Sequence, residues 1–122
     1  MIYSGSILYN FDNSGAIKVY CIKGMTKRKI KFLKICDILL ITTKRIFAWK
    51  KIKLGIKYRF LLVNTLYGLT RVDMKLKFWF NSGIILKKDD MVPLASRIFI
   101  VTPLEFRLKN LKRILTMGKP NL

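Results

Sequence analysis

The chain has 122 residues, 52% of them hydrophobic, and its 25 lysines and arginines face six acidic residues and no histidine. This composition excludes an extended disordered chain and predicts one domain over residues 1–122 with a buried core. No apolar stretch reaches the roughly 18 residues of a membrane-spanning helix, and two cysteines without histidine cannot supply four zinc ligands. The net charge of +19 favours a polyanionic partner, which is either nucleic acid or an anionic membrane surface.

A polar turn separates the first two predicted strands. The residues of Ile7–Phe11 are β-prone, and Asp12–Gly15 reads Asp-Asn-Ser-Gly, which is the composition of a tight turn. In the strand that follows, alternation places Lys18 and Tyr20 on one face. The opposite face is apolar and consists of Ile17, Val19 and Cys21. We therefore expect a hairpin whose second strand presents a basic face.

Two basic segments contain no acidic residue. The first runs from Lys23 to Lys34, and the second, Lys44–Gly55, interleaves bases with aromatic residues that include Trp49. Loops of this kind place cations on phosphates and a ring against a base or sugar, so both segments are predicted to contact nucleic acid. The alternatives are a solvated charged loop for the first segment and, for Trp49, packing at the edge of the core.

Apolar runs predict the inner strands. The segment Asp37–Thr43 is a continuous apolar run that we expect to be a buried strand, and Lys57–Thr65 predicts a second core strand. A further strand pair is expected over Arg71–Phe80, with its lysines pointing outward. The segment Asn81–Gly83 has turn composition and is expected to punctuate the chain before a last short strand at Ile84–Leu86.

The pattern changes to a helical period near the C-terminus. Residues Thr102–Glu105 form a capping box with proline at the first helical position, and Gly118 and Pro120 mark the end of the helix. Leucines recur between them at helical spacing, namely Leu104, Leu108, Leu111 and Leu115. Short strands before one helix predict a mainly β fold, either a barrel or a sandwich, over about residues 1–90 and a helical part over about 91–122.

No set of residues suits catalysis or a cofactor. The acidic residues Asp12, Asp37 and Glu105 have structural uses in a turn, a strand start and a cap, and no histidine can act as a general base. Motifs for nucleotide binding or nucleophilic catalysis are absent. We therefore predict no enzyme, no cofactor and no metal site. Cys21 and Cys36 are expected to be buried small hydrophobic residues, and a disulfide between them is the alternative.

Motifs of one known family run in order along almost the whole chain. Asp12–Ala16, followed by Val19-x-Cys21-Ile22-Lys23, is similar to the opening of that family. Later matches are Asp37-Ile38, Ile41-Thr42, Thr65, Gly68, Arg71, Asp73, Lys77-Phe78, Asn81, Pro93, Arg97-Ile98-Phe99, Glu105 and Arg107. On these residues the chain resembles the universal large-subunit ribosomal protein number fourteen, the L-fourteen family.

The chain also departs from the pattern of that family. Ile17 stands where the family has a base, Cys36 where it has glycine, and Trp79-Phe80 where it has Asp-Gly. We expect these differences to change the turn geometry near residues 70–80. We also expect that contacts with protein, or a shorter ribosomal RNA, replace some of the contacts that the family makes.

The resemblance implies a closed β-barrel of about five strands with short C-terminal α-helices. It implies a structural constituent of the large ribosomal subunit that binds large-subunit ribosomal RNA, touches neighbouring ribosomal proteins and reaches small-subunit RNA in an intersubunit bridge. With the basic segments, it predicts RNA contacts at Asn13, Ser14, Lys18, Lys23, Lys27, Arg28, Lys29, Lys44, Arg45, Trp49, Lys50, Lys51, Lys53, Arg71, Lys77 and Arg107. A ribosome-silencing factor docks on the C-terminal face of the family, which corresponds here to Ser96, Arg97, Lys112 and Arg113.

The N-terminus lacks the order of a secretory signal and the Arg- and Ser-rich composition of a transit peptide. The abundance of Lys, Ile, Leu and Phe resembles translation from an A/T-rich genome. We therefore expect an organelle-encoded protein of the mitochondrial ribosome, with a plastid or a bacterial cytoplasm as the alternatives. The competing function is a peripheral cationic protein on anionic membranes, which requires an amphipathic helix with an exposed apolar face.

Overall fold

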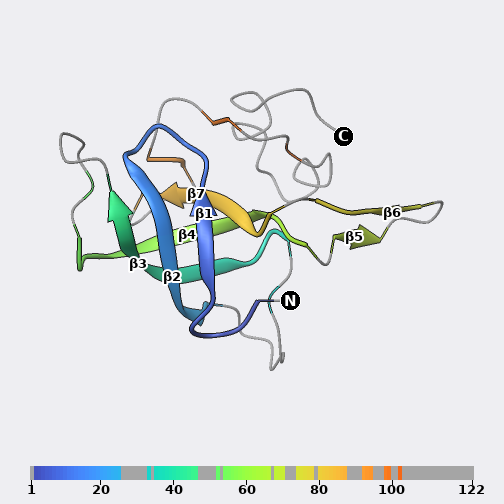
Figure 1. Ribbon diagram of the computed structural model, residues 1–122, viewed down its shortest axis with the longest axis horizontal. Coiled ribbons are helices and arrows are strands. Elements are labelled where there is room, and N and C mark those ends of the chain that lie inside the picture. Colours follow the sequence, from blue (N-terminus) through green and yellow to red (C-terminus); the bar gives the residue numbers. More distant parts are fainter. Residues whose placement is uncertain are drawn as a thin grey trace.

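The computed structural model describes residues 2–25, 33, 35–46, 52, 54–66, 68–70, 74–78, 80–87, 92–94, 98–99 and 102. Within these residues the chain forms β1 (Ile7–Asn10), β2 (Ala16–Gly24), β3 (Ile38–Ile46), β4 (Lys57–Asn64), β5 (Leu69–Thr70), β6 (Lys75–Leu76) and β7 (Ser82–Leu86). Five of them close into a barrel in the order β1-β2-β3-β4-β7 (Figure 1). The predicted mainly β fold with a closed barrel of about five strands is confirmed, and the predicted C-terminal helix lies outside the described residues.

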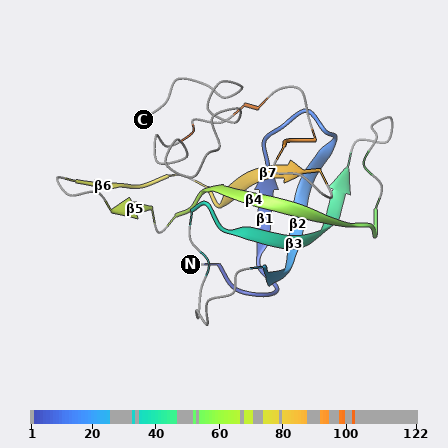
Figure 2. The same cartoon turned by 180° about the vertical axis from the view of Figure 1, so that it is seen from behind.

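The barrel closes through one parallel pair of strands. Neighbouring strands from β1 to β4, and β4 with β7, pair antiparallel, whereas β1 and β7 pair parallel with Tyr9 opposite Ser82. The short strands β5 and β6 pair only with each other, Leu69 with Leu76 and Thr70 with Lys75. Figures 1 and 2 show this hairpin extending to one side of the barrel, away from the closing strands.

The core fills the inside of the barrel with alternate residues of each strand. In β3 the side chains of Leu39 and Ile41 are buried, whereas Leu40 and Thr42 between them are only half-buried. The prediction of a fully buried strand at Asp37–Thr43 is therefore wrong for its outer face, since a barrel strand faces the core on one side only. The inner cluster consists of Ile2, Leu8, Ala16, Val19, Cys21, Leu33, Leu39, Ile41, Ile52, Phe60, Leu62 and Ile85.

A second apolar cluster covers the outside of β4 and β7. It contains Leu61, Val63, Ile84, Leu86 and Ile98. A backbone bridge from Asp12 to Ile98 holds that covering residue against the barrel. Because β4 is covered on both sides, its residues from Phe60 onward are all buried, which explains why its sequence is continuously apolar rather than alternating.

Three strand boundaries differ from those predicted. The basic segment expected as a loop from Lys44 begins inside β3, because pairing of Ile46 with Ala16 keeps β3 alongside β2 to that point. The strand pair expected over Arg71–Phe80 starts earlier and is shorter, as β5 and β6 show. The expected turn at Asn81–Gly83 is also wrong in part, because Ser82 and Gly83 already belong to β7.

Gly83 lies in β7 at a point where β4 packs too closely to leave room for a side chain. A Cβ atom on Gly83 would lie 2.1 Å from the backbone oxygen of Leu61 and 2.6 Å from the ring of Phe60. Phe60 has no exposed surface and sits in the inner cluster. The glycine therefore serves close strand contact rather than a turn.

The two cysteines do not form a disulfide, and they lie in different surroundings. Cys21 is fully buried in the inner cluster, as predicted, whereas Cys36 is only half-buried. Cys36 has a φ of 73°, a left-handed conformation that favours glycine. This is the position at which the resemblance has glycine, a residue that adopts such a φ without steric cost.

We expect the two thiols to react at different rates with a water-soluble thiol reagent. Burial raises the pKa of the Cys21 thiol, so less of the reactive thiolate is present at a given pH. At pH 8 Cys36 should be labelled first, and Cys21 should react roughly a hundredfold more slowly because its exposure requires opening of the core. Mass spectrometry of Cys21→Ser and Cys36→Ser separates the two rates, and equal rates would contradict the buried placement of Cys21.

Candidate nucleic-acid interface

A row of aromatic and cationic side chains crosses the outer face of β1, β2 and β3. Tyr9 pairs with Lys18, and Lys18 pairs in turn with Arg45 at a point where the register of β2 with β3 shifts on either side of Lys18. Directly paired residues on neighbouring strands place their side chains on the same face of a sheet. All three side chains are half-buried or exposed, so the row faces outward. The structure thus brings together two predicted RNA contacts, Lys18 and Arg45, which are far apart in the sequence.

Lysines lie over the two tyrosines of this face. The Nζ atom of Lys18 lies 5.7 Å from the centre of the Tyr9 ring, and that of Lys44 lies 5.0 Å from the centre of the Tyr20 ring. Cation–π contacts at exposed sites contribute about 0.5–1 kcal/mol each. They hold the ammonium groups near the sheet surface, where each can still donate hydrogen bonds to a phosphate.

Among the residues that the structure describes, no carboxylate opposes these cations at the surface. The two acidic side chains it places, Asp12 and Asp37, are both buried. Among the described residues, the charged side chains on the outer face of β1, β2 and β3 are therefore all cationic, which favours a polyanionic partner.

A buried polar cluster fixes the turn that joins β1 to β2. Oδ1 of Asp12 accepts hydrogen bonds from Nδ2 of Asn10 at 2.6 Å, from the backbone N–H of Ser14 at 3.0 Å and from the Ser14 hydroxyl. Oδ2 of Asp12 accepts one from the backbone N–H of Ile85 in β7 at 3.2 Å. Asn10 also donates to the carbonyl of Ala16 at 3.0 Å. The cluster joins β1, β2 and β7 of the barrel and thereby holds the turn between the first two strands of the cationic row.

The other described RNA-contact predictions lie away from this row. Ser14 is buried with its hydroxyl donating to Asp12, and Asn13 beside it is half-buried. Lys23 near the end of β2 and Lys77 after β6 are exposed. The remaining predictions lie outside the described residues, namely Lys27, Arg28, Lys29, Trp49, Lys50, Lys51, Lys53, Arg71 and Arg107, and so do the predicted docking residues Ser96, Arg97, Lys112 and Arg113.

The sequence placed Tyr20 on the same face as Lys18 but did not single out Tyr9, Phe11 or Phe80. Tyr9 and Phe11 lie two positions apart in the β1 segment, and their alternation with buried Leu8 and Asn10 was the available signal. Phe80, just before β7, joins them in a cluster of three rings. No local pattern connects it to β1, since the contact depends on how the barrel closes.

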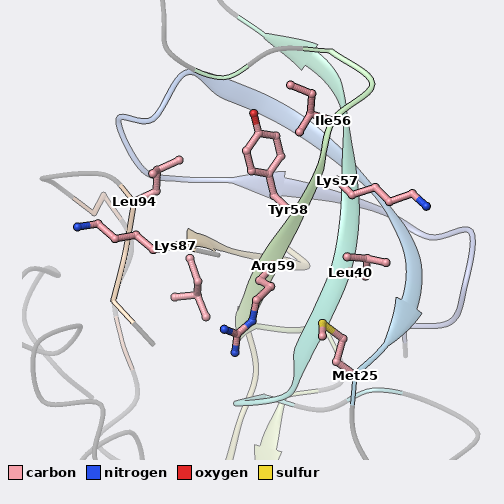
Figure 3. A pocket seen from close by; sticks show the side chains of 9 residues that line it. Met25, Leu40, Ile56, Lys57, Tyr58, Arg59, Lys87 and Leu94 are labelled. Atoms are coloured by element: carbon pink, nitrogen blue, oxygen red, sulfur yellow. The ribbon is translucent and has the colours of Figure 1, made fainter. Parts of the chain in front are cut away.

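A hollow of about 580 Å³ lies between β3, β4 and the segment that follows β7. Figure 3 shows Met25 and Leu40 on one side and Lys87 and Leu94 on the other. Among the described residues, its cationic lining residues are Lys57, Arg59 and Lys87, and the others are apolar apart from the Tyr58 hydroxyl.

Two further properties concern only the described part of the chain. No three or more potential ligands gather there to hold a metal ion. No helix there has the length and apolarity to cross a bilayer.

Comparison with known protein families agrees with the order of the motifs along the chain. The chain matches the family model described as ribosomal protein L14p/L23e over residues 1–121.

Proposed function

The chain belongs to the ribosomal protein L14p/L23e family, and from that premise we propose that it binds large-subunit ribosomal RNA through the outer face of β1, β2 and β3. Members of this family are structural constituents of the large ribosomal subunit, and the protein is therefore ribosomal and not an enzyme. We propose which face of the protein binds RNA, which partners it has besides that RNA, and in which compartment it works.

The single observation that carries the proposal is the cationic row with its tyrosines. Lys18, Lys44 and Arg45 project from two paired strands, and two of them lie over tyrosine rings. Ribosomal RNA is the polyanion of the particle, and lysine and arginine contacts to its phosphates supply affinity without a base code. A rigid barrel that holds these cations in fixed positions adds selectivity for the shape of a folded RNA.

A triple charge-removal variant tests this face. Replacing Lys18, Lys44 and Arg45 by glutamine removes three phosphate contacts. We expect the slope of log affinity against log salt concentration to become shallower by about 2 to 3, because each contact contributes roughly 0.7–0.9. The measurement is filter binding of the full chain to large-subunit ribosomal RNA across a salt series. Stability should fall by no more than about 1–2 kcal/mol, which is the contribution of the two lost cation–π contacts, since these side chains are not buried.

The matched control removes equal charge from other exposed positions, Lys57, Lys75 and Lys87. This control should change the slope less than the triple variant does. Equal slopes for the two variants would refute the assignment of the face. Binding of the protein to anionic vesicles but not to structured RNA would instead favour the peripheral membrane function.

The finer expectations from the resemblance belong to the same proposal. We infer one ribosomal-protein domain over residues 1–122, contact with small-subunit RNA at an intersubunit bridge and neighbouring ribosomal proteins as partners. We also infer a docking face for a silencing factor at Ser96, Arg97, Lys112 and Arg113. The A/T-biased composition supports a mitochondrial ribosome. Sedimentation gives the direct test, because the protein should travel with mitochondrial large subunits and leave them at high salt.

A further inference from the structure

We propose that Phe80, together with Tyr9 and Phe11, forms a platform on which one unpaired RNA base stacks, with Lys18 beside it to hold a phosphate. This inference rests on the proposed function, because it names the kind of nucleotide that the cationic face takes. The base belongs to a single-stranded or bulged nucleotide, since paired bases inside an RNA helix present no free face for a ring to stack on.

The three rings form a compact cluster at the outer surface of the barrel. The ring centres of Tyr9 and Phe11 are 6.2 Å apart and their planes differ by 9°. Phe80 stands at 69° to both, with its ring centre 5.5 Å from that of Tyr9 and 5.9 Å from that of Phe11. These are favourable aromatic geometries, so the two rings of β1 support Phe80 from one side.

The backbone around Phe80 is held in place on two sides. The carbonyl of Asn81 accepts a hydrogen bond from the backbone N–H of Tyr9 at 3.0 Å. The side-chain Oδ1 of Asn81 accepts one from the backbone N–H of Leu66 at 2.8 Å. Phe80 is thus fixed before any partner arrives, which lowers the entropy cost of binding. Phe11 also packs against the outer apolar cluster, which anchors the ring cluster to the body of the protein.

The exposed area suits one base better than a protein partner. Phe80 is 49% exposed although its ring packs against two others. A whole phenylalanine offers at most about 250 Å², so the free part of Phe80 is comparable to one face of a base. A stable protein interface needs about 800 Å² on each partner, which this cluster does not provide by itself.

Charge complementarity also selects a nucleotide. In the barrel β1 lies between β7 and β2, so the cationic row begins on the opposite side of Tyr9 from Phe80. Lys18 lies over the Tyr9 ring, and Arg45 is the next residue in that row. Among the described residues no surface carboxylate interrupts it, because both placed acids are buried. An aromatic ring that lies next to a row of cations is complementary to a nucleotide, whose base lies next to its phosphates.

Fluorescence of 2-aminopurine tests the platform. The probe is a short single-stranded oligoribonucleotide of uridines with one central 2-aminopurine, whose emission falls when it stacks on an aromatic ring. Binding of the full chain should quench the probe. Phe80→Leu keeps an apolar side chain without a stacking face and should weaken binding roughly 5- to 150-fold and abolish the quenching. Phe80→Trp should retain both, and Lys18→Gln should make the salt slope shallower while leaving the quenching at saturation.

The outcomes distinguish this inference from the function on which it rests. If the Phe80→Leu variant binds the probe and quenches its fluorescence as the unchanged protein does, the platform is wrong. The proposed function would still stand in that case, provided that the affinity for RNA keeps its steep dependence on salt. If the unchanged protein binds no RNA, the proposed function fails and the platform with it. Equal competition by a fully paired RNA duplex would also overturn the platform. In assembled particles, ultraviolet cross-linking should join the Phe80 peptide to RNA, and a cross-link to protein instead would contradict the inference.

Discussion

Replacing Gly83 by alanine is expected to lower the free energy of unfolding by about 3 kcal/mol or more. The added Cβ atom would meet the backbone oxygen of Leu61 at 2.1 Å and the ring of Phe60 at 2.6 and 2.9 Å. A flexible side chain could move away, but a backbone oxygen within the pair of β4 and β7 cannot do so without separating the strands. Denaturant unfolding followed by circular dichroism gives the value.

The neighbouring residue supplies a matched control for this substitution. Ser82 is fully buried, and its hydroxyl finds no hydrogen-bond partner within the described structure. Ser82→Ala removes a buried polar group that contributes no bond, so stability should be unchanged or higher. If Ser82→Ala destabilised the barrel as much as Gly83→Ala, the effect would reflect general sensitivity of β7 and not the close contact.

Replacing Asp12 by alanine is expected to cost about 3–4 kcal/mol of stability. The substitution removes the acceptor of a backbone N–H in Ser14, of another in Ile85 and of the Asn10 amide. The Asn10 amide keeps its bond to the Ala16 carbonyl, whereas each of the two backbone donors left without a partner costs about 1–3 kcal/mol, and part of this cost is relieved as water reaches the turn. Thermal or urea unfolding measures the loss.

Two conservative variants show which property of Asp12 matters. Asp12→Asn keeps the size but places an amide NH₂ group where one oxygen now accepts, so it should lose less stability than alanine does. Asp12→Glu keeps the charge but moves both oxygens by one methylene group. If Glu restored full stability, charge rather than the position of the oxygens would explain the stabilising effect of Asp12. If alanine were neutral, the cluster would not stabilise the barrel.

Much of the barrel was predictable because its strands carry local signals. Alternation in the segment after the first turn and the apolar runs near positions 40 and 60 predicted β2, β3 and β4. The Asp12–Gly15 turn was also predictable, since its side chains bond their own backbone. Closure into a barrel came from the family resemblance, because the residue pattern alone left a sandwich equally open.

The prediction failed where one residue type occurs both in loops or turns and in strands. Lys44 and Arg45 were assigned to a loop because they are charged, yet they belong to β3 and are both exposed, near a shift in its register with β2 where regular alternation of faces does not hold. Gly83 was assigned to a turn because glycine usually marks one, and only the position of Phe60 reveals its purpose. Neither reason can be obtained from neighbouring residues in the sequence.

The candidate site was likewise predictable only in part. Lys18 and Arg45 were predicted individually as basic residues, but their adjacency depends on the pairing register of β2 with β3. The ring cluster was missed because Phe80 meets Tyr9 and Phe11 only through the parallel pairing of β1 with β7. Contacts between distant segments therefore account for most of what the sequence could not predict.

The parallel seam between β1 and β7 also has a consequence for synthesis of the protein. Asp12 and Ile85 are joined by a hydrogen bond although 73 positions separate them. While the chain is being synthesised, one edge of β1 therefore stays unpaired until β7 has been made. Long-range closure of this kind slows folding and leaves an edge that can pair with other chains. Early capture of the growing barrel by a polyanion or a chaperone would shorten that vulnerable interval.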